Sequence, residues 1–141
     1  MEPMFTGSYH VAKDDYTSAG HASADIKRQL KHIGVGGDVL RRVAVASYEV
    51  ELNLVIHSLG GELTLNVYPG LVQLVSTDVG PGIPDLNLAM KEGYSTASET
   101  ARSLGFGAGM GLPNMKRNAD DFDIQSTVGV GTTITMGFHL S

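Results

Sequence analysis

Two short segments separated by a proline–glycine pair most constrain the fold of this chain. In ELTLNVY (62–68) apolar and polar residues alternate, as in a strand with one buried face, while LVQLVST (71–77) is more apolar throughout. Pro69 and Gly70 between them favour a tight turn, so the two segments are predicted to form a β-hairpin. An antiparallel sheet is therefore expected as one layer of the fold.

Further strands are predicted at both ends of the chain. Near the start, SYHVAK (8–13) alternates and is typical of an edge strand. The segment FDIQSTVGVGTTITMGFHL (122–140) predicts a second hairpin. The second arm of this hairpin carries apolar residues at every second position, which are Ile134, Met136, Phe138 and Leu140.

Two helices are expected between the first strand and the central hairpin. One face of the first helix collects Ala22, Ile26, Leu30 and Ile33, and Gly34 is placed to end it. Asp38 is placed to cap a longer helix that continues to about His57. A helical turn with Leu86 and Met90 spaced i, i+4 is also indicated, as is a short helix over about 112–120.

The order of these elements predicts an α+β fold, in which helices cover one face of a mostly antiparallel, mixed sheet in a two-layer sandwich. The 141 residues fit one domain, 1–141, because no internal repeat and no long linker divides them.

Composition excludes several classes of function. The net charge is −5, and no run of Lys or Arg exceeds a pair, so nucleic-acid binding is not expected. The chain has no cysteine, which excludes disulfides, thiolate catalysis and cysteine-based zinc sites. We find no long apolar run and no signal-peptide pattern, so we expect a cytoplasmic protein that does not enter a membrane.

A carboxylate and a carboxamide share one face of the predicted long helix. Glu49 and Asn53 are spaced i, i+4, whereas Leu52, Val55 and Ile56 are expected to be buried. An Asn oxygen suits Mg²⁺, which takes few protein ligands beside substrate phosphates. A nearby Glu suits a general base for phosphoryl transfer. The alternative is two solvated polar residues, and Glu51 is interpreted as a surface residue.

A second candidate site follows the buried strand, in STDVGPGIPD. Asp78 stands at the strand end, with Gly80 and Gly82 close behind it. Glycines let another backbone or a ligand approach closely, and the carboxylate suits an exocyclic amine such as that of adenine. The alternative is an ordinary turn that Asp, Pro and Gly initiate.

A glycine-rich loop, GFGAGMG (105–111), precedes the short helix. It matches neither the Walker pattern nor the dinucleotide fingerprint. A glycine-rich loop that enters a helix can still offer backbone amides to phosphate, and the alternative is a simple hinge. The hydroxyl-rich stretch before it suggests a lid over about 91–111. Downstream, Thr132 at the start of a strand either assists Asp78 or belongs only to a turn.

The order of these four pieces resembles the ATP-binding domain of the GHKL superfamily, which includes gyrase, the heat-shock 90 chaperones and sensor histidine kinases. The pieces are E-x-x-x-N, D-x-G-x-G, a lid with G-x-G-x-G, and G-T. The resemblance covers about residues 40–140 and implies a Bergerat-type fold with ATP and Mg²⁺ as cofactors. The segment GFGAGMGLPNMKR narrows the resemblance to the anti-sigma-factor or switch serine/threonine kinases of bacterial partner-switching systems.

The resemblance also implies roles for individual residues. Glu49 would be the catalytic base and Asn53 the Mg²⁺ ligand, while Asp78 would bind the adenine amine. The remaining nucleotide-binding positions would be Gly80, Gly82, Ile83, Gly107, Gly109, Met110, Gly111 and Thr132. His57 stands where such kinases often carry His, and we favour a supporting role for it.

The resemblance implies an enzyme that phosphorylates a Ser or Thr of a STAS-type antagonist protein, and it also implies homodimerisation. A nucleotide-loaded module that sequesters a sigma factor with little turnover is the main alternative. A histidine-kinase catalytic domain is a third, although the five histidines lie scattered and none is in a long helical hairpin.

Overall fold

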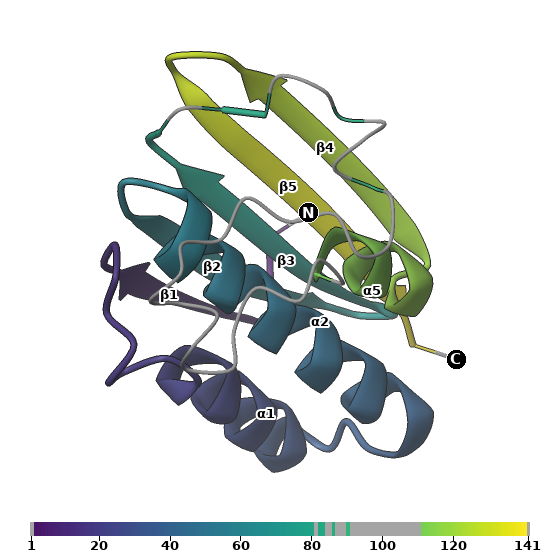
Figure 1. The fold of residues 1–141 in the computed structure, drawn as a ribbon. Coiled ribbons are helices and arrows are strands. Elements are labelled where there is room, and N and C mark those ends of the chain that lie inside the picture. Colours follow the sequence, from purple (N-terminus) through teal and green to yellow (C-terminus); the bar gives the residue numbers. More distant parts are fainter. Residues whose placement is uncertain (1, 81, 84–85, 87–89, 91–110, 141) are drawn as a thin grey trace.

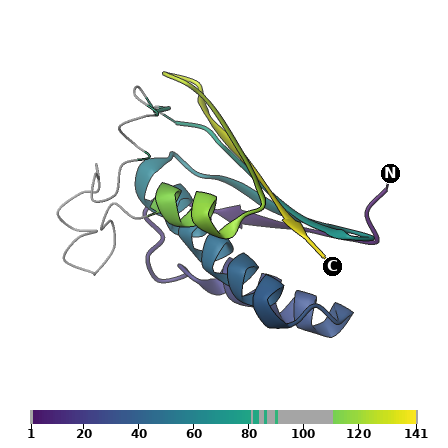
Figure 2. The ribbon, with the colours of Figure 1, turned by 90° about the vertical axis from the view of Figure 1, so that its right-hand side faces the viewer.

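The computed structural model describes residues 2–80, 82–83, 86, 90 and 111–140. Over these ranges the chain forms a five-stranded sheet with helices packed against one face (Figure 1). Seen from the side, the opposite face of the sheet carries no helix from the described part of the chain (Figure 2). The predicted two-layer α+β sandwich is confirmed.

The sheet has the spatial order β1-β2-β3-β5-β4. Its strands are β1 (Phe5–Val11), β2 (Gly61–Tyr68), β3 (Leu71–Asp78), β4 (Asp121–Thr127) and β5 (Gly131–His139). Both predicted hairpins are present, and every neighbouring pair of described strands is antiparallel. The first strand covers Phe5–Val11 instead of 8–13, because it pairs along its whole length with β2.

Among the residues that the structure describes, three helices lie on the covered face: α1 (His21–Ile33), α2 (Gly37–His57) and α5 (Gly111–Asn118). The prediction that Asp38 caps α2 is wrong. Gly36 is the N-cap residue, and Asp38 lies inside the first turn. There its carboxylate accepts hydrogen bonds from Arg41 and Arg42, at 2.8 Å each, because residues three and four positions apart meet on a helix.

The core lies between the helices and the inner face of the sheet. Of the alternating apolar residues in the second arm of the terminal hairpin, Ile134, Met136 and Phe138 are buried, whereas Leu140 follows β5 and is only partly buried. The largest fully buried side chains are Ile26, Leu30, Val43, Val50, Leu54, Leu63, Leu65, Leu74, Met115, Ile134, Met136 and Phe138. Burial of each such side chain contributes about 1.5–3 kcal/mol. Ile33 departs from prediction, since it ends α1 and is 40% exposed. Leu52 is only partly buried, while Leu54 fills the core.

Glu51 is buried, so the interpretation of this residue as part of the surface is wrong. Only 2% of it is exposed, and its carboxylate faces the start of α1. It accepts hydrogen bonds from the backbone N–H groups of Gly20, Ala22 and Ser23 at 2.9–3.1 Å. Gly20 offers no side chain to cap α1, so a residue of α2 satisfies these amides and their partial positive charge.

Two predictions concern the chain between β3 and α5. The N–H of Met90 donates to the carbonyl of Leu86 at 3.0 Å, which agrees with the indicated helical turn. The proposed lid lies, apart from Gly111, outside the described residues, as do Gly107, Gly109 and Met110. In the described part of the chain, no helix combines the length and apolarity needed to cross a bilayer.

Candidate functional site

Asp78 is fixed at the end of β3 by the neighbouring strand β5. Its Oδ1 atom accepts a hydrogen bond of 2.9 Å from the backbone N–H of Thr132. The other oxygen, Oδ2, has no hydrogen bond to a described residue. Burial raises the pKa of the Asp78 carboxyl, and the Thr132 hydrogen bond only partly offsets this. One carboxylate oxygen is thus anchored while the other can accept a donor.

A chain of hydroxyl groups extends from Thr132 to Ile83. The hydroxyls of Thr132 and Ser126 lie 2.8 Å apart, and the N–H of Ile83 donates to Ser126 Oγ at 2.7 Å. Ser126 pairs with Thr132 across the β4–β5 ladder, so both side chains point to the same face. The structure therefore brings together three of the predicted nucleotide-binding residues: Asp78, Ile83 and Thr132.

Gly80, Gly82 and Gly131 lie where protein backbone approaches closely. A Cβ on Gly82, which has a φ of 74°, would lie 2.5 Å from the carbonyl oxygen of Thr127. A Cβ on Gly131 would lie 2.1 Å from the carbonyl oxygen of Asp78. Gly82 and Gly131 thus let the segment after β3 pack against the β4–β5 turn, whereas a Cβ on Gly80 would lie 3.2 Å from the backbone nitrogen of Leu59. Contact between Gly80 or Gly82 and a nucleotide stays a prediction.

Glu49 lies half-buried where α2 packs against α5. Its Oε1 accepts a hydrogen bond of 3.4 Å from the Asn114 side chain. A Cβ on Gly111, the first residue of α5, would lie 3.4 Å from the other oxygen, Oε2. Burial raises the pKa of the Glu49 carboxyl, and the Asn114 hydrogen bond lowers it to a smaller extent. A carboxylate held in this way has increased affinity for a proton.

Asn53 follows one turn later on α2 and is also half-buried. Its amide makes no hydrogen bond to another described residue, so its oxygen can serve as a ligand. In the described part of the chain, no three His, Asp or Glu side chains gather to hold a metal ion. A neutral amide oxygen near one carboxylate fits Mg²⁺ only if most other ligands are water or phosphate oxygens.

Backbone hydrogen bonds join the segments that follow α2 and β3, the two elements that carry Asn53 and Asp78. Leu59, just after α2, donates its N–H to the carbonyl of Val79 at 2.8 Å. Val79 in turn donates to the carbonyl of Gly60 at 3.2 Å. These backbone bonds join the end of α2, which carries Asn53, to the end of β3, which carries Asp78 (Figure 1).

Comparison with known families agrees with this arrangement. The family described as "Histidine kinase-, DNA gyrase B-, and HSP90-like ATPase" matches residues 39–141. The chain belongs to this ATPase family. The match contains both groups of residues, from Glu49 to Thr132, whereas β1 and α1 lie before it. The resemblance drawn from the four pieces of sequence is confirmed.

Several curated relatives of this ATPase family resemble the chain over most of its length. The serine/threonine-protein kinase RsbT of Bacillus subtilis is 31% identical over 108 residues, which cover 74% of this chain and 75% of that protein. The anti-sigma F factor of Bacillus licheniformis is 34% identical over 110 residues, which cover 74% of this chain and 72% of that protein. The anti-sigma F factor of Bacillus subtilis is 32% identical with the same coverage.

His57 continues the face of α2 that carries Glu49 and Asn53. It lies eight residues after Glu49 and is partly buried. Desolvation lowers the pKa of the His57 imidazole, which favours its neutral form. The supporting role of His57 stays a prediction.

A separate cleft of about 370 Å³ lies between β1, α1 and α2. It is lined by residues that include Tyr9, Asp25 and Glu51, and none of the predicted site residues lines it. Three of its polar side chains already have partners, since Tyr9 donates to Asp25 and Glu51 accepts from the backbone at the start of α1. We assign this cleft no part in nucleotide binding.

Two residues at the site, Ser126 and Asn114, are not among those predicted from the sequence. Ser126 was detectable, because the register of the predicted terminal hairpin places it opposite Thr132. Asn114 was not, since its contact with Glu49 depends on how α5 packs on α2.

Proposed function

We propose that this protein is an ATP- and Mg²⁺-dependent protein kinase that phosphorylates a Ser or Thr of a STAS-type antagonist in a bacterial partner-switching system. One observation carries the proposal: Glu49 is held half-buried between α2 and α5, one turn before an Asn53 amide that binds no described residue. The similarity to a protein named as a serine/threonine kinase supports it.

The proposal gives the nucleotide two contact regions. Asp78 Oδ2 accepts the adenine amine, with Thr132, Ile83, Gly80 and Gly82 around the base. Gly111 at the start of α5 contributes to phosphate binding, together with Gly107, Gly109 and Met110. The N–H groups at a helix N-terminus suit phosphate, and Gly111 begins such a helix.

Asn53 is the protein ligand that we assign to Mg²⁺. When bound, Mg²⁺ would supply positive charge to the phosphate oxygens. The fit rests on the unengaged amide of Asn53, and the rest of the coordination shell would come from water and phosphate.

Glu49 acts as the general base in this proposal. The hydroxyl oxygen of the substrate forms a bond to the γ-phosphorus while the bond from that phosphorus to the bridging oxygen breaks, and ADP leaves. The hydroxyl proton passes to the Glu49 carboxylate. Burial raises the pKa of Glu49, so the carboxylate holds this proton better than an exposed Glu would.

Transfer of labelled phosphate tests the proposal. The purified protein is incubated with Mg²⁺, γ-labelled ATP and the STAS proteins encoded beside it. Phosphate should transfer to a Ser or Thr, and Glu49→Gln should abolish transfer while ATP binding persists. Glu62→Gln, an exposed change on β2, is the matched control. Normal transfer by Glu49→Gln would refute the role of the base.

Sequestration of a sigma factor is the second candidate function. The relatives named as anti-sigma F factors, at 32–34% identity, favour it. In that case the same site binds nucleotide without useful turnover. Pull-down from the native host, with and without ATP, separates the two: a sigma factor retained in the presence of ATP supports sequestration.

We also propose that the protein is a cytoplasmic homodimer. ATP and sigma factors are cytoplasmic, which gives the location. The edge strand β1 suits pairing of two copies better than β4, because β4 and the residue before it carry Asp120, Asp121 and Asp123, which repel a second copy. Sedimentation with and without ATP measures the oligomeric state.

A further inference from the structure

We propose that Asn114 on α5 is a positioning residue that holds the Glu49 carboxylate in its working orientation. This inference rests on the proposed role of Glu49 as the base. The side-chain Nδ2 of Asn114 donates to Glu49 Oε1 at 3.4 Å, across the contact between α5 and α2. Both residues are half-buried, so the contact is partly shielded from water.

The direction of the Asn114 amide follows from the groups on its two sides. Arg117 Nη1 lies 2.8 Å from Asn114 Oδ1, and a guanidinium can only donate. The atom that faces Arg117 must therefore be the amide oxygen. The amide NH₂ then faces Glu49, which as a carboxylate can only accept. A rotated amide would place donor against donor on one side and acceptor against acceptor on the other.

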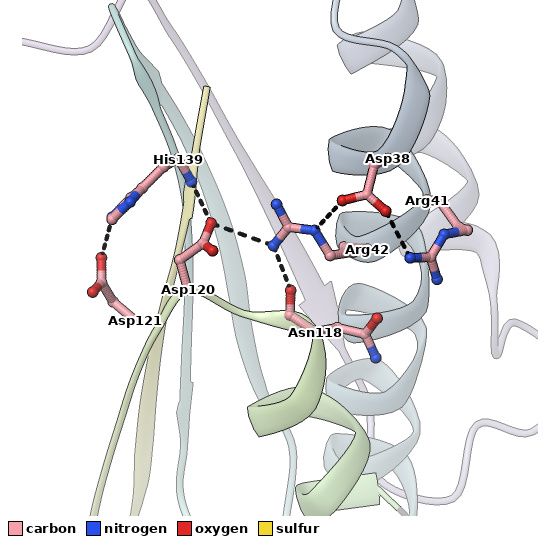
Figure 3. Close-up of polar contacts among 7 residues, drawn as sticks. All are labelled: Asp38, Arg41, Arg42, Asn118, Asp120, Asp121 and His139. Atoms are coloured by element: carbon pink, nitrogen blue, oxygen red, sulfur yellow. Dashed lines mark hydrogen bonds and ion pairs between the residues drawn. The ribbon is translucent and has the colours of Figure 1, made fainter. Parts of the chain in front are cut away.

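The backbone of α5 is fixed at its far end, which keeps Asn114 in place. Arg42 of α2 donates from Nη1 to the carbonyl oxygen of Asn118 at 2.8 Å and reaches Asp120 at 3.3 Å (Figure 3). The side chains of Leu112 and Met115 on α5 are buried in the core. Asn114 is thus presented to Glu49 by a helix anchored on the same helix α2.

The hydrogen bond from Asn114 favours one orientation of the Glu49 side chain, which would otherwise rotate. Glu49 has no other hydrogen bond to a described side chain, so without Asn114 its two oxygens exchange places readily. A general base loses rate when its oxygen is misplaced, even if the substrate binds normally. The contact should therefore affect turnover and leave nucleotide affinity unchanged.

Asn114→Ala and Asn114→Leu test the inference. Ala and Leu both have a higher helix propensity than Asn, and Leu has a side chain of similar size to that of Asn. The fold should therefore persist in both variants. We expect kcat for phosphate transfer to fall about 10-fold, with the Kd for ATP changed less than about twofold. Asn118→Ala is the matched control, because Asn118 Nδ2 donates to the Asn114 carbonyl at 2.8 Å on the same helix and does not contact Glu49.

The kinetic outcomes separate a positioning role from a merely structural one. A fall in kcat that spares ATP affinity and is absent from Asn118→Ala supports the inference. An equal fall in Asn118→Ala, or a loss confined to ATP affinity, overturns it.

A second measurement does not depend on kinase activity. The denaturation midpoints of the wild type, Glu49→Ala, Asn114→Ala and the double variant form a double-mutant cycle. Non-additive shifts show that the two side chains interact, and additive shifts overturn the inference. If the wild type binds ATP but transfers no phosphate, the proposed kinase function fails. The cycle still decides whether Asn114 holds Glu49.

Discussion

The guanidinium of Arg42 donates a hydrogen bond of 2.8 Å to the carbonyl oxygen of Asn118, the last residue of α5 (Figure 3). The same nitrogen approaches Asp120, which also accepts the backbone N–H of His139 at 2.7 Å. One side chain of α2 thus joins the end of α5 to the edge of the sheet. α5 is the helix that faces Glu49, so this connection helps to define the geometry of the site.

Replacing Arg42 should destabilise the protein more than replacing its neighbour. Only 18% of the Arg42 side chain is exposed, against 64% for Arg41. Arg42→Ala leaves the Asn118 carbonyl without its charged donor, so the free energy of unfolding should fall by about 1–3 kcal/mol. Arg41→Ala loses one exposed ion pair, worth about 0.5 kcal/mol or less. Urea unfolding measures both, and equal losses would contradict the assigned role.

Glu51 should be needed for the stability of the fold. Glu51→Ala removes three acceptor contacts from the buried start of α1, and the free energy of unfolding should fall by about 3 kcal/mol. Glu62→Ala, an exposed change on β2, should cost about 0.5 kcal/mol or less. Chemical denaturation followed by circular dichroism compares them. A Glu51→Ala protein as stable as the wild type would refute the capping role.

Asp78 should determine adenine affinity without controlling the fold. Asn at this position keeps an oxygen for the Thr132 N–H but replaces Oδ2 with a donor. Asp78→Asn should therefore weaken ATP binding at least about 10-fold, or about 1.4 kcal/mol, in calorimetry. Asp123→Asn, on the exposed face of β4, is the control and should bind normally. Unchanged affinity in Asp78→Asn would exclude the proposed adenine contact.

Gly111 should matter more for ATP binding than for stability. A methyl group there would lie 3.4 Å from Glu49 Oε2, at the start of α5. Gly111→Ala should weaken ATP binding about 10-fold, while the free energy of unfolding changes by less than about 1 kcal/mol, because Ala favours helix. Gly36→Ala is the control, since a Cβ there meets nothing within 4 Å. Calorimetry and urea unfolding give the two quantities, and a parallel loss of both would favour a purely structural glycine.

The free energy of unfolding should depend on pH through the half-buried carboxyl group of Glu49. Burial raises the pKa of Glu49 in the folded state above its value in the unfolded chain. The folded state therefore binds this proton more tightly, and the stabilisation by the proton is lost as pH rises through the raised pKa. Glu49→Gln should then be more stable than the wild type near neutral pH, with the difference shrinking below the ordinary pKa of Glu. Urea unfolding at several pH values measures the trend, and a difference that grows on acidification would contradict it.

Most helices and strands of the fold, and the order of the candidate site residues along the chain, can be predicted from the sequence. Alternation in 62–68, where side chains point in turn to two faces, together with the apolar segment 71–77 and the Pro69–Gly70 pair between them, predicts the hairpin that the structure contains. The spacing of Glu49 and Asn53 placed them one turn apart on a helix that the structure contains. Asp78 was found because it directly follows a buried strand.

The pairing of polar groups from different elements could not be predicted from the sequence. Glu51 was misinterpreted as exposed, because its partners lie about thirty residues earlier in the chain, at the start of α1. The contacts of Asn114 with Glu49 and of Arg42 with Asn118 likewise depend on the packing of α5 on α2. Periodicity describes one helix or strand at a time. The partner of a buried polar group is chosen by contact between elements, since burial without such a partner costs more free energy than an isolated segment can recover.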